Sequence, residues 1–430
     1  MVVLGLQHMF AMFGATVLVP LLTGLDVSTT LLFAGVGTLL FHFLTKWKVP
    51  AFLGSSFAFL GGYAAIAPLG ADGSASALLP YAGFGVACAG LLYLLLALLI
   101  KVFGTKKIMQ FFPPIVTGPI IIAIGLTLSK SAIDNCSNDW LIAVIAIALV
   151  IISNIWGKGM IKIVPIIIGV LGSYVIAAIF GKVDFAPLAQ ADWFGLPIHW
   201  NATVFSIFKD LDVSLLLTSV VTIMPIALAT MVEHIGDISA ISSTVGINYF
   251  KAPGLHRTLL GDGLATILAS LFGAPANTTY GENTGVLSLT KVYDPKVVRI
   301  AAGFALLFSF SPKFAALISC MPVATVGGVS LVLYGMISAV GVRNIVETRV
   351  DFSKSRNIII AALILVLAIG INYSTLGSIA FHIGSVTISL SGLAVGALVG
   401  ILMNAILPGK DYVFDEEKPD ETGVDFSVRG

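Results

Sequence analysis

Apolar stretches of about 15 to 22 residues follow one another along nearly the whole chain, with only short polar segments between them. Hydrophobic residues make up 57% of the 430 residues, whereas charged residues make up only 10%. Soluble proteins carry about 25% charged residues, so a soluble fold of this size would lack the charges to cover its surface. The sequence therefore predicts an all-α polytopic membrane protein, since a membrane-spanning helix needs about 20 apolar residues.

Fourteen spans fit this pattern, because 14 spans of roughly 20 residues occupy roughly 280 residues and leave short loops. They are expected near 2–22, 28–45, 53–67, 80–100, 114–129, 141–156, 162–181, 214–240, 258–273, 275–290, 298–311, 314–340, 357–372 and 387–407. With both termini in the cytoplasm, 19 of the 23 Lys and Arg residues lie on the cytoplasmic side. This asymmetry supports the even number of spans and the orientation.

Two of these spans are poor membrane helices. The third begins with Pro50 and continues through Gly54-Ser55-Ser56-Phe57, and the tenth begins with Pro275 and continues through Asn277-Thr278-Thr279-Tyr280-Gly281. Each reads as a short extended strand followed by a half-helix, third in its own set of seven spans. Matching interruptions predict a substrate site at mid-membrane, and an odd set of seven predicts an inverted 7+7 repeat. The alternative is chance similarity between two packing segments rich in Gly, Ser and Thr.

Ionisable residues inside membrane spans are costly and are functional candidates by default. The eighth span contains Glu233, His234 and Asp237, and the tenth contains Glu282 directly after Gly281. Glu233 and Asp237 are four residues apart on one helix face, where two carboxylates repel each other and one is expected to hold a proton. For His234, the alternative is a packed imidazole with a structural role.

The first span adds Gln7 and His8 as polar residues. Asp262 is expected to be an N-terminal residue of the ninth span, where an acidic side chain favours the helix dipole. No role is assigned to His42, His199, His256 or His382. The stretch 182–213 is expected to form an outer loop near the membrane interface, because it contains Trp193 and Trp200.

Two carboxylates opposite two helix N-termini suit a neutral planar ligand that presents both N–H donors and C=O acceptors. Carboxylate oxygens accept the ligand N–H groups, and backbone N–H groups near Phe57 and Gly281 donate to its carbonyls. Phe57, Tyr280 and Tyr334 supply aromatic rings for stacking. The residues alone therefore predict a flat polar heterocycle as the ligand.

The chain resembles the nucleobase–ascorbate transporter family over essentially its whole length. The resemblance is carried by Gln7-His8, Gly54-Ser55-Ser56-Phe57, Glu233-His234, Asn277-Thr278-Thr279-Tyr280-Gly281-Glu282-Asn283-Thr284-Gly285 and Gly327-Gly328-Val329-Ser330 with Tyr334. It implies proton-coupled symport of a nucleobase, with Phe57, Glu233, Tyr280, Gly281 and Glu282 binding the substrate. It also implies that Asp237, His234, Ser330 and Tyr334 serve proton coupling or gating.

The resemblance further implies a moving core domain and a gate domain. The core domain would comprise 1–110 and 214–312, the gate domain 111–213 and 313–409, and the cytoplasmic tail 410–430. Glu282 is similar to the uracil branch of the family, since purine-transporting relatives commonly have Gln there. Asp237 departs from that branch, because uracil-transporting relatives of enteric bacteria have His and purine-transporting members have Asp. Uracil is therefore the expected substrate, and a purine such as xanthine or urate is the alternative.

Other classes of function fit less well. An anion exchanger of similar architecture would place its substrate beside repelling carboxylates. An enzyme is not expected, because the chain lacks G-x-S-x-G, H-E-x-x-H and Walker A motifs. Neither a cofactor nor a metal is expected, since the three cysteines are scattered, and a net charge of +1 argues against nucleic acid.

The expected location is the cytoplasmic (inner) membrane, with lipid around the protein. The resemblance implies a homodimer. The series Gly392, Gly396 and Gly400 marks either a dimer contact or packing of the last span within the chain.

Overall fold

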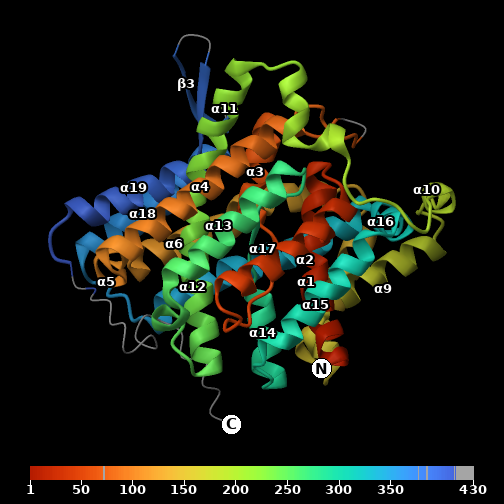
Figure 1. Cartoon of the computed structure of the whole chain (residues 1–430), viewed down its shortest axis with the longest axis horizontal. Helices are drawn as coiled ribbons and strands as arrows, with labels where there is room; N and C mark the ends of the chain where they lie inside the picture. Colours follow the sequence, from red (N-terminus) through yellow and green to blue (C-terminus); the bar gives the residue numbers. More distant parts are fainter. Residues whose placement is uncertain (71–72, 376, 384–385, 411, 413–430) are drawn as a thin grey trace.

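The computed structural model describes residues 1–70, 73–375, 377–383, 386–410 and 412, and it is mainly helical (Figure 1). The longer helices are α1 (Val2–Thr23), α2 (Val27–Leu44), α4 (Leu79–Phe103), α6 (Pro114–Cys136), α7 (Trp140–Ile155), α9 (Pro165–Ile179), α12 (Ala227–Val245), α13 (Leu255–Leu271), α15 (Pro295–Ser309), α17 (Val323–Glu347), α18 (Ser355–Asn372) and α19 (Gly392–Ile406). The shorter ones are η1 (Phe57–Phe59), α3 (Leu60–Ile66), α5 (Thr105–Met109), α8 (Met160–Ile163), α10 (Ala186–Gln190), η2 (Trp200–Ala202), η3 (Val204–Lys209), α11 (Val213–Ile223), η4 (Met224–Ile226), η5 (Phe250–Gly254), α14 (Gly281–Thr290) and α16 (Pro312–Ser319). The strands are β1 (Leu53–Ser55), β2 (Asn277–Thr279), β3 (Ser378–Ile383) and β4 (Val386–Ser391).

The helices have the length and composition of a multi-pass membrane protein. Among the described residues, six helices are long and apolar enough to cross a membrane, or seven if α15 and α16, bent by 89°, count as one span. Further apolar helices, including α7, α9 and α19, have 10–17 residues. The expected total of 14 spans therefore stays a prediction.

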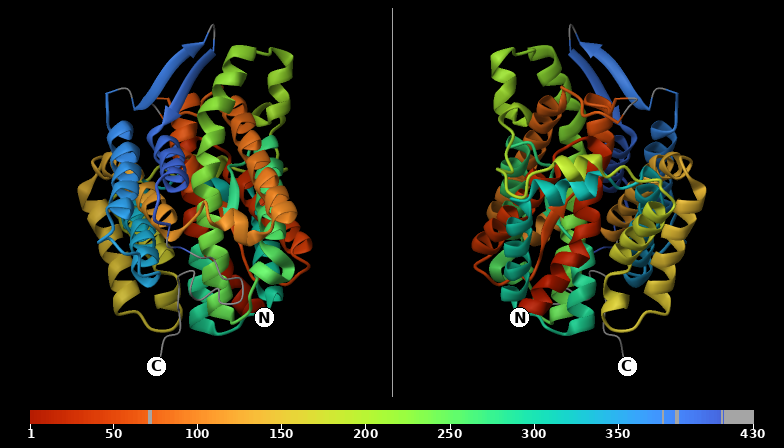
Figure 2. Two further views of the ribbon diagram at one scale, coloured as in Figure 1. Left: turned by 90° about the vertical axis from the view of Figure 1, so that its left-hand side faces the viewer. Right: turned by 90° about the vertical axis from the view of Figure 1, so that its right-hand side faces the viewer.

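The long helices pack in two groups. In the first group, α13 packs against α4 and α2, and α15 packs against α2 and α1. In the second, α17 packs against α6, α7 and α9, and α18 packs against α19 and α6. The two groups lie side by side, with the N-terminus at one end of the molecule and the β3–β4 hairpin at the other (Figure 2).

The two interrupted segments meet in the middle of the fold. Strands β1 and β2 pair antiparallel, with Leu53 opposite Thr279 and Ser55 opposite Asn277. A short helix follows each strand, η1 with α3 after β1 and α14 after β2. The two segments are far apart in the sequence but lie side by side, and the short helix of each segment starts next to the two-stranded ladder.

The expectation of an all-α fold is wrong at residues 378–391, where β3 and β4 form an antiparallel hairpin. The last helix begins at Gly392, so the span expected at 387–407 starts too early. The segment runs Ser-Ile-Ala-Phe-His-Ile and Val-Thr-Ile-Ser-Leu-Ser around Gly384-Ser385, which is a strand–turn–strand pattern of alternating residues. The span at 387–407 was predicted from apolar content, which does not distinguish the alternating residues of a strand from a membrane helix.

The span expected at 314–340 is also divided. Helix α16 ends at Ser319, and α17 begins at Val323 directly after Pro322. Proline has no backbone N–H to continue α16, and it favours a helix start. Residues 413–430 of the expected solvated tail lie outside the described residues.

The glycine series on α19 packs within the chain. A Cβ atom on Gly392 or Gly396 would lie 2.3 or 2.8 Å from a carbonyl oxygen of α18. These glycines therefore allow α18 and α19 to approach closely, which supports the intrachain alternative for this series.

Candidate substrate-binding site

The β1–β2 ladder holds the ring of Tyr280 in place. The Tyr280 hydroxyl donates a hydrogen bond of 2.6 Å to the carbonyl of Ser55, and the ring is buried. Gly54 lies directly beneath it, because a Cβ atom there would be 2.7 Å from the Tyr280 ring and 2.7 Å from the Thr16 hydroxyl. The small residue at position 54 is therefore required by the close approach of Tyr280 and α1.

Phe57 faces helix α17. Its ring meets the ring of Tyr334 edge to face, with centroids 5.5 Å apart, and both side chains are buried. Ser330 lies one turn before Tyr334 and is also buried. Within the described part of the chain, the two hydroxyl groups make no hydrogen bond of regular geometry. The Ser330 and Tyr334 hydroxyl groups nevertheless interact with each other, so they form a neighbouring polar pair on α17.

His234 lies in a buried hydrogen-bond network between α12, α13 and β2. Its Nδ1 atom is 2.8 Å from a carboxylate oxygen of Asp262 and 3.1 Å from the Thr279 hydroxyl, and Nε2 is 3.0 Å from the Thr258 hydroxyl. The Thr279 hydroxyl donates to Asp237 over 3.3 Å, and the backbone N–H of Thr279 donates to Asp262 over 3.2 Å. Two acidic residues and one imidazole are thus connected through a single threonine.

The expectation for Asp262 is wrong. Helix α13 begins at Leu255, so Asp262 lies within the helix, where its side chain is fully buried and paired with His234. A direct hydrogen bond to His234 compensates the burial of the Asp262 carboxyl group better than a distant helix end does. The signal in the sequence is an acidic residue between Gly261 and Gly263 in an apolar span, which is a functional candidate by default.

Asp237 lies at the N-terminus of α14. A Cβ atom on Gly281, the first residue of that helix, would be 3.1 Å from a carboxylate oxygen of Asp237. The positive end of the helix dipole therefore faces this carboxylate. Glu233 lies one turn earlier on α12 and is half-buried, with polar interactions of its own. Glu282 follows Gly281 in the first turn of α14, but its side chain lies outside the described residues.

Helix α1 also contacts α14 through polar groups. The side-chain nitrogen of Asn283 lies 3.2 Å from Nδ1 of His8 and 3.4 Å from the His8 carbonyl. Both residues are buried. The imidazole of His8 is therefore a packed, hydrogen-bonded group that positions the first turn of α14.

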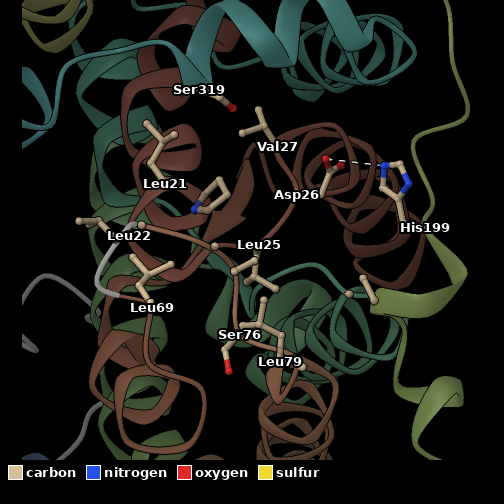
Figure 3. Close-up of a pocket in the computed structure, with 18 of the residues that line it drawn as sticks. Leu21, Leu22, Leu25, Asp26, Val27, Leu69, Ser76, Leu79, His199 and Ser319 are labelled. Carbon is tan, nitrogen blue, oxygen red and sulfur yellow. Dashed lines mark ion pairs between the residues drawn. The ribbon is translucent and has the colours of Figure 1, made fainter. Parts of the chain in front are cut away.

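A separate cavity of about 950 Å³ lies near the C-terminal end of α1 (Figure 3). Leu25 and Leu79 line it from the first helix group, and Ser319 and Val323 line it beside α17. Asp26 and His199 face each other across 3.8 Å at its edge (Figure 3). Phe57, Tyr280 and Glu233 do not line this cavity, so it lies apart from the predicted binding residues.

The arrangement brings aromatic rings, backbone N–H groups and carboxyl groups together around the β1–β2 ladder. No group of three or more His, Cys, Asp or Glu side chains suited to a metal was found in the described residues. Thr279 and Thr258 belong to the network although the sequence assigned no role to them, and Asp262 belongs to it although it was expected only at a helix N-terminus. Their contribution depends on contacts between separate helices, which a linear pattern does not reveal.

The fold is that of a helical, multi-pass membrane protein and is shared with solved membrane transporters. It is similar to the transmembrane domain of the cyanobacterial bicarbonate transporter BicA, with a TM-score of 0.56, 14% identity and coverage of 93% of this chain and 95% of that one. It is also similar to SLC26A9, with a TM-score of 0.62, 14% identity and coverage of 94% and 64%.

The sequence matches the family described as "Permease family" over residues 1–377, and the chain belongs to that family. Uracil permeases of Bacillus caldolyticus and Bacillus subtilis (strain 168) are each 40% identical to it. These alignments cover 97% and 94% of this chain and 95% and 92% of the relatives. The uracil permease of Escherichia coli (strain K12) is 36% identical, with coverage of 97% and 95%.

Proposed function

We propose that this chain is a proton-coupled symporter that imports uracil across the cytoplasmic membrane. The observation that carries this proposal is the 40% identity to a uracil permease over 97% of the chain. The aligned region covers 97% of this chain and 95% of that relative, so the similarity spans nearly the whole length of both proteins.

The geometry near β1 and β2 suits a flat ring with alternating donors and acceptors. Glu233 and Glu282 accept ligand N–H groups, and backbone N–H groups at the starts of η1 and α14 donate to ligand carbonyls. Phe57 and Tyr280 flank the ring, and Tyr334 approaches from α17. The close contact between Phe57 and Tyr334, with centroids 5.5 Å apart, supports an aromatic wall at this position.

Asp237 and His234 are the proposed proton-coupling groups. Asp237 accepts a hydrogen bond from Thr279, the last residue of β2, and lies beside Gly281. A proton on Asp237 would remove a negative charge from the N-terminus of α14, where a substrate carbonyl is proposed to bind. Proton binding and substrate binding would therefore act on the same backbone groups.

Alternating access is proposed to move a core domain (1–110 and 214–312) against a gate domain (111–213 and 313–409). The two packing groups of helices support this division, because α1, α2, α4, α13 and α15 belong to one and α6, α7, α9, α17, α18 and α19 to the other. The gate would contribute Ser330 and Tyr334. The chain is further proposed to form a homodimer surrounded by membrane lipid, with both termini in the cytoplasm.

A purine such as xanthine or urate is the second candidate substrate. Asp237 favours it, because a carboxylate beside Gly281 presents an acceptor where an imidazole would present a donor. The two candidates differ in ring size, so direct competition separates them.

Uptake of radiolabelled uracil into proteoliposomes tests the proposal. An inward proton gradient should drive accumulation, a protonophore should abolish it, and unlabelled uracil should compete better than xanthine, urate or cytosine. Asp134→Asn is the matched control, because Asp134 is an exposed carboxylate paired with Lys130 at the surface. Stronger competition by xanthine than by uracil would assign the chain to purines, and accumulation without a gradient would exclude proton symport.

A further inference from the structure

The Thr279 hydroxyl occupies a position that none of the proposed roles includes. It is buried at the end of β2, one residue before Tyr280 and two before Gly281. It donates to Asp237 over 3.3 Å and lies 3.1 Å from Nδ1 of His234. The same residue donates its backbone N–H to Asp262. Thr279 therefore connects both proposed proton-coupling residues to the strand that leads into α14.

The hydrogen-bond roles follow from the donors and acceptors present. The Thr258 hydroxyl donates to the carbonyl of Leu255, so it accepts from Nε2–H of His234. A carboxylate oxygen of Asp262 lies 2.8 Å from Nδ1 of His234, so a proton between these two atoms joins the side chains in a buried hydrogen bond. The Thr279 oxygen shares the Nδ1 proton with Asp262.

Asp237 is the variable member of this network. An ionised Asp237 accepts the Thr279 O–H across the 3.3 Å between the two oxygens. A protonated Asp237 has an O–H of its own and can donate to the Thr279 oxygen. The Thr279 hydroxyl therefore changes from donor to acceptor when a proton binds to Asp237, while its backbone stays tied to Asp262.

We propose that Thr279 is a positioning residue that transmits the charge state of Asp237 to the β2–α14 junction. The His234–Asp262 pair keeps the backbone of Thr279 in place while the hydrogen bond of the Thr279 hydroxyl changes. The inference rests on the proposed proton-coupled function and deepens it, since it names the group through which a proton acts on the backbone donors of the site.

Other charged groups face the same network. Glu233 lies on the same helix as Asp237, and the ring of Tyr93 from α4 lies 6.5 Å from the ring of His234. Asp262 faces it from α13. All of these groups stay in place when only the Thr279 hydroxyl is removed, so their charges cannot account for the effect of that substitution.

Thr279→Val tests the proposal because it removes the hydroxyl and keeps the branched shape. Thr279→Ser restores a hydroxyl, and Thr279→Ala removes it in a second way if the valine variant folds poorly. Thr278→Val is the matched control, because Thr278 is the preceding residue of β2 and its side chain points to the opposite face of the strand. Each variant is examined by uracil calorimetry, equilibrium exchange and gradient-driven accumulation across external pH.

Thr279→Val should keep equilibrium exchange, lower gradient-driven accumulation at least about fivefold and displace its pH profile, as expected for losing a hydrogen bond to a charged group. Thr279→Ser and Thr278→Val should behave like the wild type. In an Asp237→Asn background, Thr279→Val should have no further effect on the pH profile. A wild-type pH profile in Thr279→Val, or equal loss in Thr279→Ser, would overturn the inference. Failure of the wild type itself to accumulate uracil would instead overturn the proposed function.

Discussion

Glu233 and Asp237 show how two acidic residues on one helix face different surroundings. Asp237 lies beside the N-terminus of α14 and accepts from Thr279. Glu233, one turn earlier, is half-buried and belongs to the proposed ligand-binding set. Two acidic residues one turn apart thus have different proposed roles, one in binding the ring and one in responding to the proton.

Replacing Glu233 or Glu282 by Ala should weaken uracil binding at least several-fold. Each carboxylate is proposed to accept an N–H group of the ring, and a buried donor without a partner costs about 1–3 kcal/mol. Isothermal titration calorimetry measures the change, with Asp134→Ala as the surface control. Wild-type affinity in either variant would remove that glutamate from the site.

Asp237→Asn should keep uracil binding and equilibrium exchange but lose accumulation driven by a proton gradient. The amide mimics the protonated carboxylic acid in shape and charge and cannot release a proton. Counterflow and gradient-driven uptake in the same proteoliposomes separate the two activities. Accumulation at the wild-type rate would assign the proton to Glu233 or Glu282 and leave Asp237 with a structural role.

His234→Gln should destabilise the protein strongly, because it leaves Asp262 as a buried charge without its partner. Breaking such a pair from one side typically costs about 3–5 kcal/mol. The double variant His234→Gln with Asp262→Asn replaces both charges by amides and should recover part of the loss. Thermal unfolding in detergent, followed by tryptophan fluorescence, compares the Tm values. Equal Tm values for the single variant and the wild type would argue against a charged pair.

At the scale of elements, the paired strands β1 and β2 position the starts of two short helices. Their ladder is short, and it is extended at each end by Ser56 N–H donating to Ala276 and Tyr280 N–H donating to Phe52. Polar side chains from neighbouring helices support it, since Thr38 contacts Leu53 and Thr266 contacts Asn277. Backbone polar groups inside a membrane protein need such partners, because hydrocarbon offers none.

Gly54→Ala should lower uracil affinity about tenfold and reduce Tm. The added methyl group would lie 2.7 Å from the Tyr280 ring, and overpacking of this kind costs about 1–3 kcal/mol. Gly61→Ala is the matched control, because a Cβ atom there has nothing within 4 Å. Calorimetry and thermal unfolding provide the two readouts. If both alanine variants bind uracil like the wild type, the ring of Tyr280 is not constrained by β1.

At the scale of the whole molecule, motion between the two helix groups is the proposed basis of transport. Helix α12 carries the proposed proton-coupling residues and also packs against α6 and α19 of the second group. Thr117 of α6 and Ser239 of α12 line the same small cavity of about 20 Å³. This cavity therefore marks a place where the two groups are close enough to be joined.

Cysteines at Thr117 and Ser239, joined by a short bifunctional reagent after replacement of the native cysteines, should abolish transport and spare uracil binding. A reducing agent that releases the link should restore transport. The control pair is Ser173 with Thr325, whose hydroxyl oxygens are 3.2 Å apart on α9 and α17 within the second group. Uptake assays and calorimetry provide the comparison. Transport that survives complete linkage of Thr117 to Ser239 would show that the moving unit is drawn wrongly.

The sequence alone established the membrane class, the positions of most long helices and the two interrupted segments. These properties are local, because apolar run length and turn-forming residues act within about 20 neighbouring residues. It also identified the motif from Asn277 to Gly285, which marks the family. The β3–β4 hairpin was not predicted from the sequence, because an alternating apolar strand and an apolar helix have similar hydropathy.

Tertiary structure alone decided which polar groups meet. Asp262 pairs with His234, and Thr279 lies between His234 and Asp237, although these residues come from α12, α13 and β2. Such contacts depend on helix packing and on the pairing of strands more than 200 residues apart, as in Leu53 with Thr279. In a low-dielectric interior a charged group is stable only where a partner lies within a few ångströms. That distance is set by the packing of the whole fold, and no local pattern in the sequence contains it.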